Sequence, residues 1–175
     1  MIVEIFKNLD SSRFMLVLAG PRRHYLIDAC NRYGIPYVFC GDEAHVRSGK
    51  DDILVNNLPP VTMNLLYNLI DLYIVTSKSE GGPKALIEAP LAGTAILATD
   101  AGMAIDILDQ RSIANDVESF VQAIDILERN KQLRNEIEQS NFTRIRNFNN
   151  YPAYKNRVQD ILIHVLKDKV KGSTI

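Results

Sequence analysis

Two glutamates on either side of a glycine pair are the side chains of this sequence best placed to bind a ligand. Glu80 directly precedes Gly81 and Gly82, and Glu88 follows after seven intervening residues. An ionised carboxylate only accepts hydrogen bonds, so the vicinal hydroxyls of a ribose or a hexose suit it as donors. Glycines without a Cβ let a ligand approach the backbone closely. The spacing therefore predicts a site for a hydroxyl-rich ligand.

The glycine pair leads into a predicted helix start that suits a phosphate. Pro83 fits the first helical position, where its missing N–H would have no acceptor. The amides of Lys84, Ala85 and Leu86 would point out of this helix start, where free donors and the helix dipole attract anions. Glycine pairs also precede helices that bind nothing, and Lys84 is then an ordinary solvated side chain.

Short apolar runs that alternate with amphipathic ones must position this segment. Predicted strands cover residues 14–18, 36–40, 53–55, 72–76 and 95–99, with helices at 22–33 and 61–70 among them. This alternation implies right-handed crossovers and a parallel sheet, and continuous apolar strands fit burial on both faces. We predict an α/β fold with a doubly wound, Rossmann-like parallel sheet of five to six strands and helices on both faces. Residues 112–114 are the candidate for the sixth strand.

From residue 116 onward, apolar side chains recur at helical spacing and predict appended C-terminal helices. We expect an N-terminal lead-in segment at residues 1–12, the Rossmann-like domain at 13–150, and a C-terminal helix and tail at 151–175. Ligands of such sheets bind beyond the carboxyl ends of the strands. Glu80 follows the strand predicted at 72–76, so this rule places the candidate site at that edge.

Composition excludes several other classes. The chain has 175 residues and a net charge of −1, and no long basic stripe for nucleic acid or anionic lipid is evident. Cys30 and Cys40 stand far apart in apolar segments, which predicts reduced, buried thiols and a cytoplasmic protein. Three scattered histidines give no metal-ligand spacing. No apolar run approaches the ~18–20 residues that span a bilayer.

The central sequence resembles the signature of glycosyltransferase family 4. The matching pattern is S-x-x-E-G-x-P-K-A-L-x-E-A, followed by A-x-G-x-x-x-x-A-T-x-x-G, and weaker similarity extends over residues 14–148. Leu65-Leu66-Tyr67 also resembles part of the family's stretch before this motif. The resemblance implies a retaining enzyme of the GT-B fold, with two Rossmann-like domains, and assigns this chain to the C-terminal, donor-binding one.

The resemblance then implies roles for individual residues. Glu80 would contact the transferred sugar as the catalytic residue, and Glu88 would hold the ribose hydroxyls. Arg22 and Arg23 would neutralise the pyrophosphate, or else belong to a solvated helix start. Asn57 and Leu58 would lie where the base of the nucleotide binds. The donor-binding residues implied in this way are Ser77, Gly81, Gly82, Pro83, Lys84, Ala85, Leu86, Glu88, Arg22, Arg23, Asn57 and Leu58. No metal and no cofactor are implied, and the substrate is a nucleotide-diphosphate sugar, with UDP or GDP as the nucleotide.

Two departures from the family pattern affect these expectations. Only about a dozen residues precede the first predicted strand, so we expect the acceptor-binding N-terminal domain to be absent from this chain. The chain is then an excised domain, a truncated product or a subunit of a split enzyme. Pro90 stands where the family usually has Met, and proline removes a helical hydrogen bond and kinks the helix just after Glu88.

The sequence therefore predicts a hexosyltransferase donor domain that transfers sugar, with retention, to a glycan or lipid-linked acceptor. It would work in the cytoplasm or at the inner face of the membrane through its partner. The alternative is a non-catalytic sugar-nucleotide-binding or assembly subunit of the same fold. A receiver-like signalling domain is a third reading, but it needs clustered acids after the first strand, where the sequence has Arg22 and Arg23.

Overall fold

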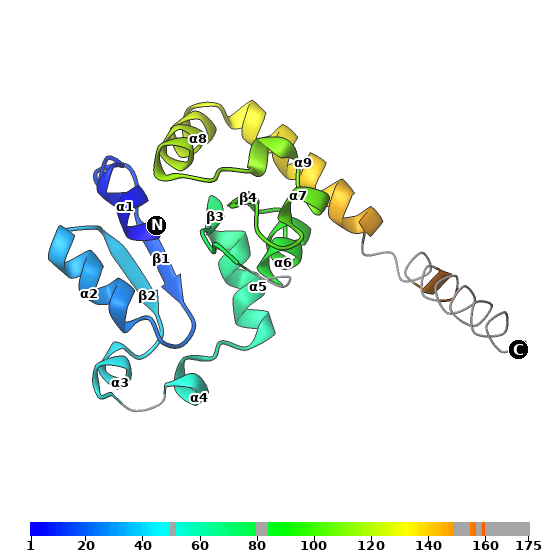
Figure 1. Ribbon diagram of the computed structural model, residues 1–175. Coiled ribbons are helices and arrows are strands. Elements are labelled where there is room, and N and C mark those ends of the chain that lie inside the picture. The colour runs from blue at the N-terminus through cyan, green and yellow to red at the C-terminus, as the bar shows by residue number, and fades with distance from the viewer. Residues whose placement is uncertain (50–51, 80–83, 149–154, 157–158, 160–175) are drawn as a thin grey trace, which may run out of the picture.

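The protein folds into an α/β domain in which short parallel strands alternate with helices (Figure 1). The computed structural model describes residues 1–49, 52–79, 84–148, 155–156 and 159. Its elements are α1 (Ile2–Lys7), β1 (Leu16–Ala19), α2 (His24–Tyr33), β2 (Tyr37–Cys40), α3 (Glu43–Arg47), α4 (Ile53–Asn56), α5 (Pro60–Leu69), β3 (Leu72–Val75), α6 (Ala85–Leu91), β4 (Ala95–Ala98), α7 (Ala104–Ile107), the 3-10 turn η1 (Gln110–Ser112), α8 (Val117–Arg129) and α9 (Lys131–Phe148). No helix in these ranges is long and apolar enough to cross a membrane.

The strands pair in parallel, as predicted, but in two separate pairs. β1 lies beside β2 with Leu16 opposite Tyr37, and β3 lies beside β4 with Leu72 opposite Ala95. Ile113, in the predicted sixth strand, makes only a single parallel bridge to Ala98. The α/β class is therefore confirmed, while the described residues form two two-stranded sheets instead of one sheet of five or six strands.

The strand predicted at residues 53–55 is wrong, because these residues form the short helix α4. The amide of Asn56 donates to the Asp52 carbonyl over 2.8 Å and closes a helical turn. The apolar side chains of this turn lie outside the core, and Leu54 is 94% exposed. A short apolar run does not by itself distinguish a strand from one turn of helix.

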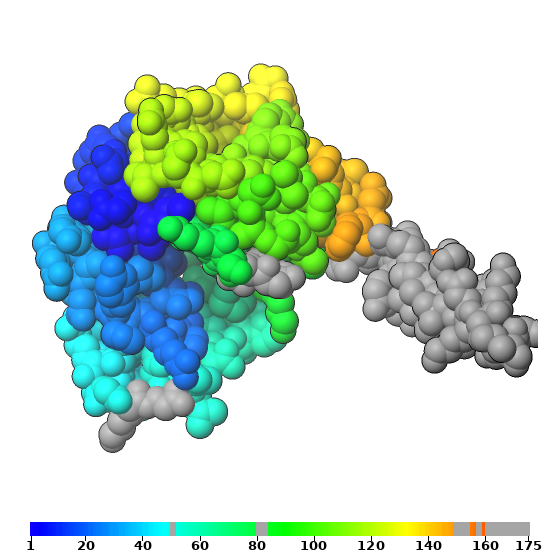
Figure 2. Space-filling model, viewed as in Figure 1, coloured from blue at the N-terminus to red at the C-terminus, as the bar shows by residue number. Residues whose placement is uncertain are grey.

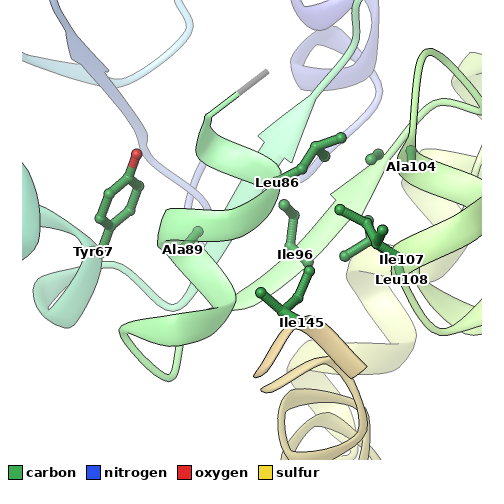
Figure 3. Close-up of a cluster of buried hydrophobic side chains, with 9 residues drawn as sticks. Tyr67, Leu86, Ala89, Ile96, Ala104, Ile107, Leu108 and Ile145 are labelled. Atoms are coloured by element: carbon green, nitrogen blue, oxygen red, sulfur yellow. The ribbon is translucent and has the colours of Figure 1, made fainter. Parts of the chain in front are cut away.

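The core lies on both faces of β4, whose four residues are all buried. Ile96 packs into a cluster with Leu86 of α6 and Ile145 of α9 (Figure 3). The next residue, Leu97, belongs to another cluster that contains Phe120 of α8. Successive side chains of a strand point to opposite faces. Helices therefore cover both faces of this strand pair, which is the layered arrangement that the sequence predicts.

The N-terminal residues belong to this core. Val3 and Ile5 of α1 are buried, and Ile5 shares a cluster with Phe120 and Ile137 of the C-terminal helices. In Figure 2 the dark blue atoms of α1 adjoin the yellow-green atoms of α8. The helix α8 begins at a capping box, in which Asp116 accepts from the amide of Ser119 and the Ser119 hydroxyl accepts from the amide of Asp116. Such a cap satisfies two amides that the helix leaves without partners.

Candidate functional site

Glu88 is an exposed residue on a helix, α6, that is otherwise anchored in the core. The amides of Ile87 and Glu88 both donate to the Lys84 carbonyl over 2.9 Å, so the helical hydrogen bonding begins at Lys84. Leu86 is fully buried and Ala89 is also at 0% exposure, which anchors the inner face of the helix. Glu88 is exposed. The burial of its neighbours therefore fixes where the Glu88 backbone lies and leaves its carboxylate accessible to a ligand.

Tyr67 of α5 holds the Glu88 carboxylate. Its hydroxyl donates to Glu88 Oε2 over 3.1 Å, and its own carbonyl accepts from the Thr94 hydroxyl over 2.6 Å. The Tyr67 ring meets the Tyr73 ring edge-on with centroids 5.4 Å apart. Burial, and secondly the neighbouring Tyr73, raise the pKa of Tyr67, so it keeps its proton and acts as a donor. The resemblance to family 4 included Tyr67, but the sequence did not single it out as a site residue.

Arg23 is fixed in the loop after β1 by its own side chain. Its Nε donates to the Ala19 carbonyl over 2.8 Å, and the side chain is half-buried. Burial raises the pKa of Tyr73, whereas the positive charge of Arg23 lowers it and the negative charge of Glu88 raises it. Both charges therefore lie close enough to Tyr73 to act on it. Arg23 and Glu88, which come from different strand pairs, thus both act electrostatically on one tyrosine.

The backbone of Arg22 is fixed by a hydrogen bond. Its φ of 58° lies in the left-handed region, and its amide donates to Asp52 Oδ2 over 2.8 Å. Its side chain is exposed. The Asp52 carboxyl has a pKa below its usual range, chiefly because it accepts this hydrogen bond from Arg22. The carboxylate is therefore the form that supports the loop.

The remaining predicted residues are distributed around the carboxyl ends of the strands. Ser77 follows β3, and its carbonyl accepts a short hydrogen bond from the Thr99 hydroxyl after β4. Asn57 is exposed and Leu58 is half-buried, directly after α4. Lys84 is exposed at the start of α6 and Ala85 is half-buried, while the buried side chain of Leu86 leaves only its amide for a ligand. The predicted residues Glu80, Gly81, Gly82 and Pro83 lie outside the described residues.

Pro90 is accommodated inside α6 without interrupting the turn that carries Glu88. It is buried, and the helix continues to Leu91. The Ala92 amide still donates to the Glu88 carbonyl over 3.0 Å. Proline cannot donate to the carbonyl four residues earlier, which here belongs to Leu86. The lost hydrogen bond thus falls on the buried face, away from the carboxylate.

A cavity of about 160 Å³ lies beside Tyr67. It is lined by residues next to the amino ends of β3 and β4, among them Ile70, Asp71, Gly93 and Thr94. In parallel α/β sheets ligands bind at the carboxyl ends of the strands, so we place the candidate site around Glu88 and Arg23 and not in this cavity. Among the described residues, no group of three His, Cys, Asp or Glu side chains is arranged to hold a metal ion.

The chain is similar to known glycosyltransferases in sequence pattern and in structure. The family described as "Glycosyl transferases group 1" matches residues 1–144. The catalytic domain of cholesterol-alpha-glucosyltransferase from Helicobacter pylori superposes with a TM-score of 0.67 at 15% identity, over 84% of this chain and 87% of that domain. Sucrose-phosphate synthase from Thermosynechococcus elongatus superposes with a TM-score of 0.65 at 14% identity, over 95% of this chain and 42% of that protein. A search of curated protein sequences found no match.

Proposed function

The chain belongs to the family of group 1 glycosyl transferases, and we propose that it forms the nucleotide-sugar-binding half of a retaining, family 4-type hexosyltransferase. The observation that carries this proposal is the exposed Glu88 carboxylate, which accepts a hydrogen bond from the Tyr67 hydroxyl, together with Arg23 in the loop after β1. A carboxylate and a guanidinium placed together match a ligand that presents both hydroxyls and phosphate. A nucleoside diphosphate sugar is such a ligand.

Each group would then have a separate task. The Glu88 carboxylate accepts hydrogen bonds from the ribose hydroxyls, and Arg22 and Arg23 neutralise the diphosphate. The bond from the anomeric carbon to the diphosphate oxygen breaks in the reaction, the acceptor oxygen forms a new bond on the same face of the sugar, and the proton of the acceptor hydroxyl passes to the departing diphosphate. Negative charge grows on the departing nucleotide, where fixed cations and amides stabilise it without reorganising. Glu80 is proposed to contact the transferred sugar.

The acceptor side of the reaction is proposed to come from a second domain or subunit. Transfer requires donor and acceptor to be held in register. The chain spans 42% of the length of the sucrose-phosphate synthase that it resembles. We propose a glycan or a lipid-linked sugar as the acceptor, with the complex in the cytoplasm or at the inner face of a membrane. UDP- and GDP-sugars are the proposed donors, without a metal or other cofactor.

Titration calorimetry with UDP, GDP, ADP and their sugar conjugates tests the proposal. We expect saturable binding of one nucleotide and a roughly tenfold weaker affinity for Glu88→Ala, the loss of a hydrogen bond to a charged group. Glu118→Ala is the matched control, because Glu118 is an exposed glutamate on α8. Binding that Glu88→Ala leaves unchanged, or a folded wild type that binds no nucleotide, would contradict the proposal. Binding without transfer, even with an acceptor domain supplied, would favour the non-catalytic subunit.

A further inference from the structure

Arg22 occupies a backbone conformation that a side-chain-bearing residue rarely adopts. Among the described residues other than glycine, it is the one with a positive φ, 58°. L-residues avoid this region because Cβ crowds the following carbonyl. The amide of Arg22 donates to Asp52 Oδ2 over 2.8 Å, and hydrogen bonds to an ionised acceptor are among the stronger ones in proteins. The Asp52 carboxylate therefore holds the loop after β1 in its unusual conformation.

Asn56 in turn fixes this carboxylate. Asp52 is 4% exposed and Asn56 is completely buried. The Asn56 side chain donates to Asp52 Oδ2 over 3.4 Å, and its Oδ1 accepts from the Asp42 amide over 2.7 Å. Buried polar groups are costly unless they are hydrogen-bonded. These two side chains therefore connect the loop after β1 to the loop after β2.

Gly41 shows how closely this connection is packed. A Cβ on Gly41 would lie 2.5 Å from Asn56 Oδ1, closer than real side chains approach. The loop after β2 thus packs directly against the side-chain amide of Asn56. The next residue, Asp42, caps α3, because its carboxylate accepts from the backbone amide of His45. Figure 1 shows α3 and α4 at the same end of the β1–β2 pair, where β1 runs into its loop. This end is the carboxyl edge, where ligands of parallel sheets bind.

We propose that Asp52 and Asn56 are positioning residues for the donor: they hold the loop after β1 so that Arg22 and Arg23 face the diphosphate. This inference rests on the proposed function for the identity of the ligand. It adds that α4 is the element that sets the loop, although its own apolar side chains lie outside the core. Because α4 leads directly into Asn57, the same buried pair also aligns the loop proposed to receive the base.

The affinities of each variant for a nucleoside diphosphate and for the matching monophosphate distinguish a role in positioning the loop from a role in the stability of the fold. The probes are the diphosphate that the wild-type chain binds best, among UDP, GDP and ADP, and the corresponding monophosphate. We expect Asp52→Ala and Asn56→Ala to weaken diphosphate binding roughly tenfold and monophosphate binding less, because the loop acts on the added phosphate. Asp52→Asn keeps an oxygen acceptor for the Arg22 amide and should recover most of the loss. Asp116→Ala, which removes the N-terminal cap of α8, is the control for a general loss of stability.

The outcomes are distinguishable. If Asp52→Ala lowers the melting temperature but leaves the ratio of the two affinities as in the wild type, as Asp116→Ala should, the positioning role is overturned. An Asp52→Asn variant as impaired as Asp52→Ala would overturn the role of the hydrogen bond. The amide resonance of Arg22 should shift as Asp52 titrates in acid, whether or not a ligand is present, and an unshifted resonance contradicts the contact. A folded wild type that binds none of the three diphosphates would instead refute the proposed function itself.

Discussion

The Tyr67 hydroxyl donates a hydrogen bond to Glu88 Oε2 over 3.1 Å, and this contact joins α5 to α6. The donor is buried and the acceptor is exposed, so a side chain packed in the core orients one at the surface. A carboxylate that is already oriented loses less side-chain freedom when a ligand binds. The contact therefore orients the Glu88 carboxylate so that its solvent-exposed part can accept hydrogen bonds from ligand hydroxyls.

Replacing Tyr67 with phenylalanine tests whether this hydrogen bond orients Glu88 for binding. The ring remains in the core beside Tyr73, but Glu88 loses its donor. We expect nucleotide affinity to fall about three- to tenfold and the free energy of unfolding to fall by about 1 kcal/mol, the typical net contribution of one hydrogen bond. Calorimetry and urea denaturation measure the two effects. Tyr25→Phe, at a tyrosine that is 70% exposed on α2, should change neither. Unchanged affinity in Tyr67→Phe would show that Glu88 needs no orientation.

Gly41→Ala should destabilise the loop after β2. The added Cβ would meet Asn56 Oδ1 at 2.5 Å and the Phe39 ring at 2.7 Å, and such overpacking typically costs about 1–3 kcal/mol. Gly49→Ala is an informative comparison, because Gly49 has a φ of 72° and open space around its Cβ position. It measures the cost of backbone strain alone, which is about 1–2 kcal/mol. Denaturation curves in which Gly41→Ala matches the wild type would contradict the close packing against Asn56.

Asn141→Ala should destabilise the link between α9 and η1. The Asn141 side chain is completely buried, accepts from the Asp109 amide over 2.7 Å and donates to the Ser112 hydroxyl over 2.8 Å. Its removal leaves the buried Ser112 hydroxyl and the half-buried Asp109 amide without this hydrogen bond, at about 1–3 kcal/mol for each group that stays unsatisfied. Thermal denaturation should show the loss, and Asn135→Ala, at an exposed position of the same helix, is the control. Equal melting temperatures for the two variants would contradict the stabilising role of Asn141.

Asp109 should make the stability of the protein sensitive to acid. The Arg111 side chain beside it lowers the pKa of Asp109 well below its ordinary value of about 3.9. Because the folded pKa is depressed, this stabilisation is fully present above the unfolded pKa and is lost as pH falls from about 4 toward the folded value. Denaturation at a series of pH values should show a steeper loss below pH ~4 in the wild type than in Asp109→Asn. Arg111→Gln should flatten the curve of stability against pH in the same way. If the curves of both variants run parallel to that of the wild type, the Asp109–Arg111 contact does not produce this acid sensitivity.

The features that sequence reasoning predicted correctly are those with a local cause. The helix predicted at residues 22–33 does end at Tyr33, where Gly34 adopts the left-handed conformation, and the continuous apolar run at β4 is buried on both faces. The predictions that failed depended on partners distant in sequence. Residues 53–55 are predicted as a strand, but they form a helical turn whose buried Asn56 side chain accepts from the Asp42 amide. Likewise Tyr67 becomes a site residue only through its contact with Glu88, and no local pattern around it shows that contact.

The position of α1 has a consequence for how the protein folds on the ribosome. Ile5 is completely buried, yet its cluster is completed by Phe120 and Ile137. Arg13 likewise forms ion pairs with Asp125 and Glu128 of α8. Synthesis proceeds at about 5–20 residues per second, so the apolar face of α1 waits several seconds for the helices that cover it. Throughout that interval the apolar face of α1 remains uncovered, and the synthesis of α8 and α9 ends its exposure.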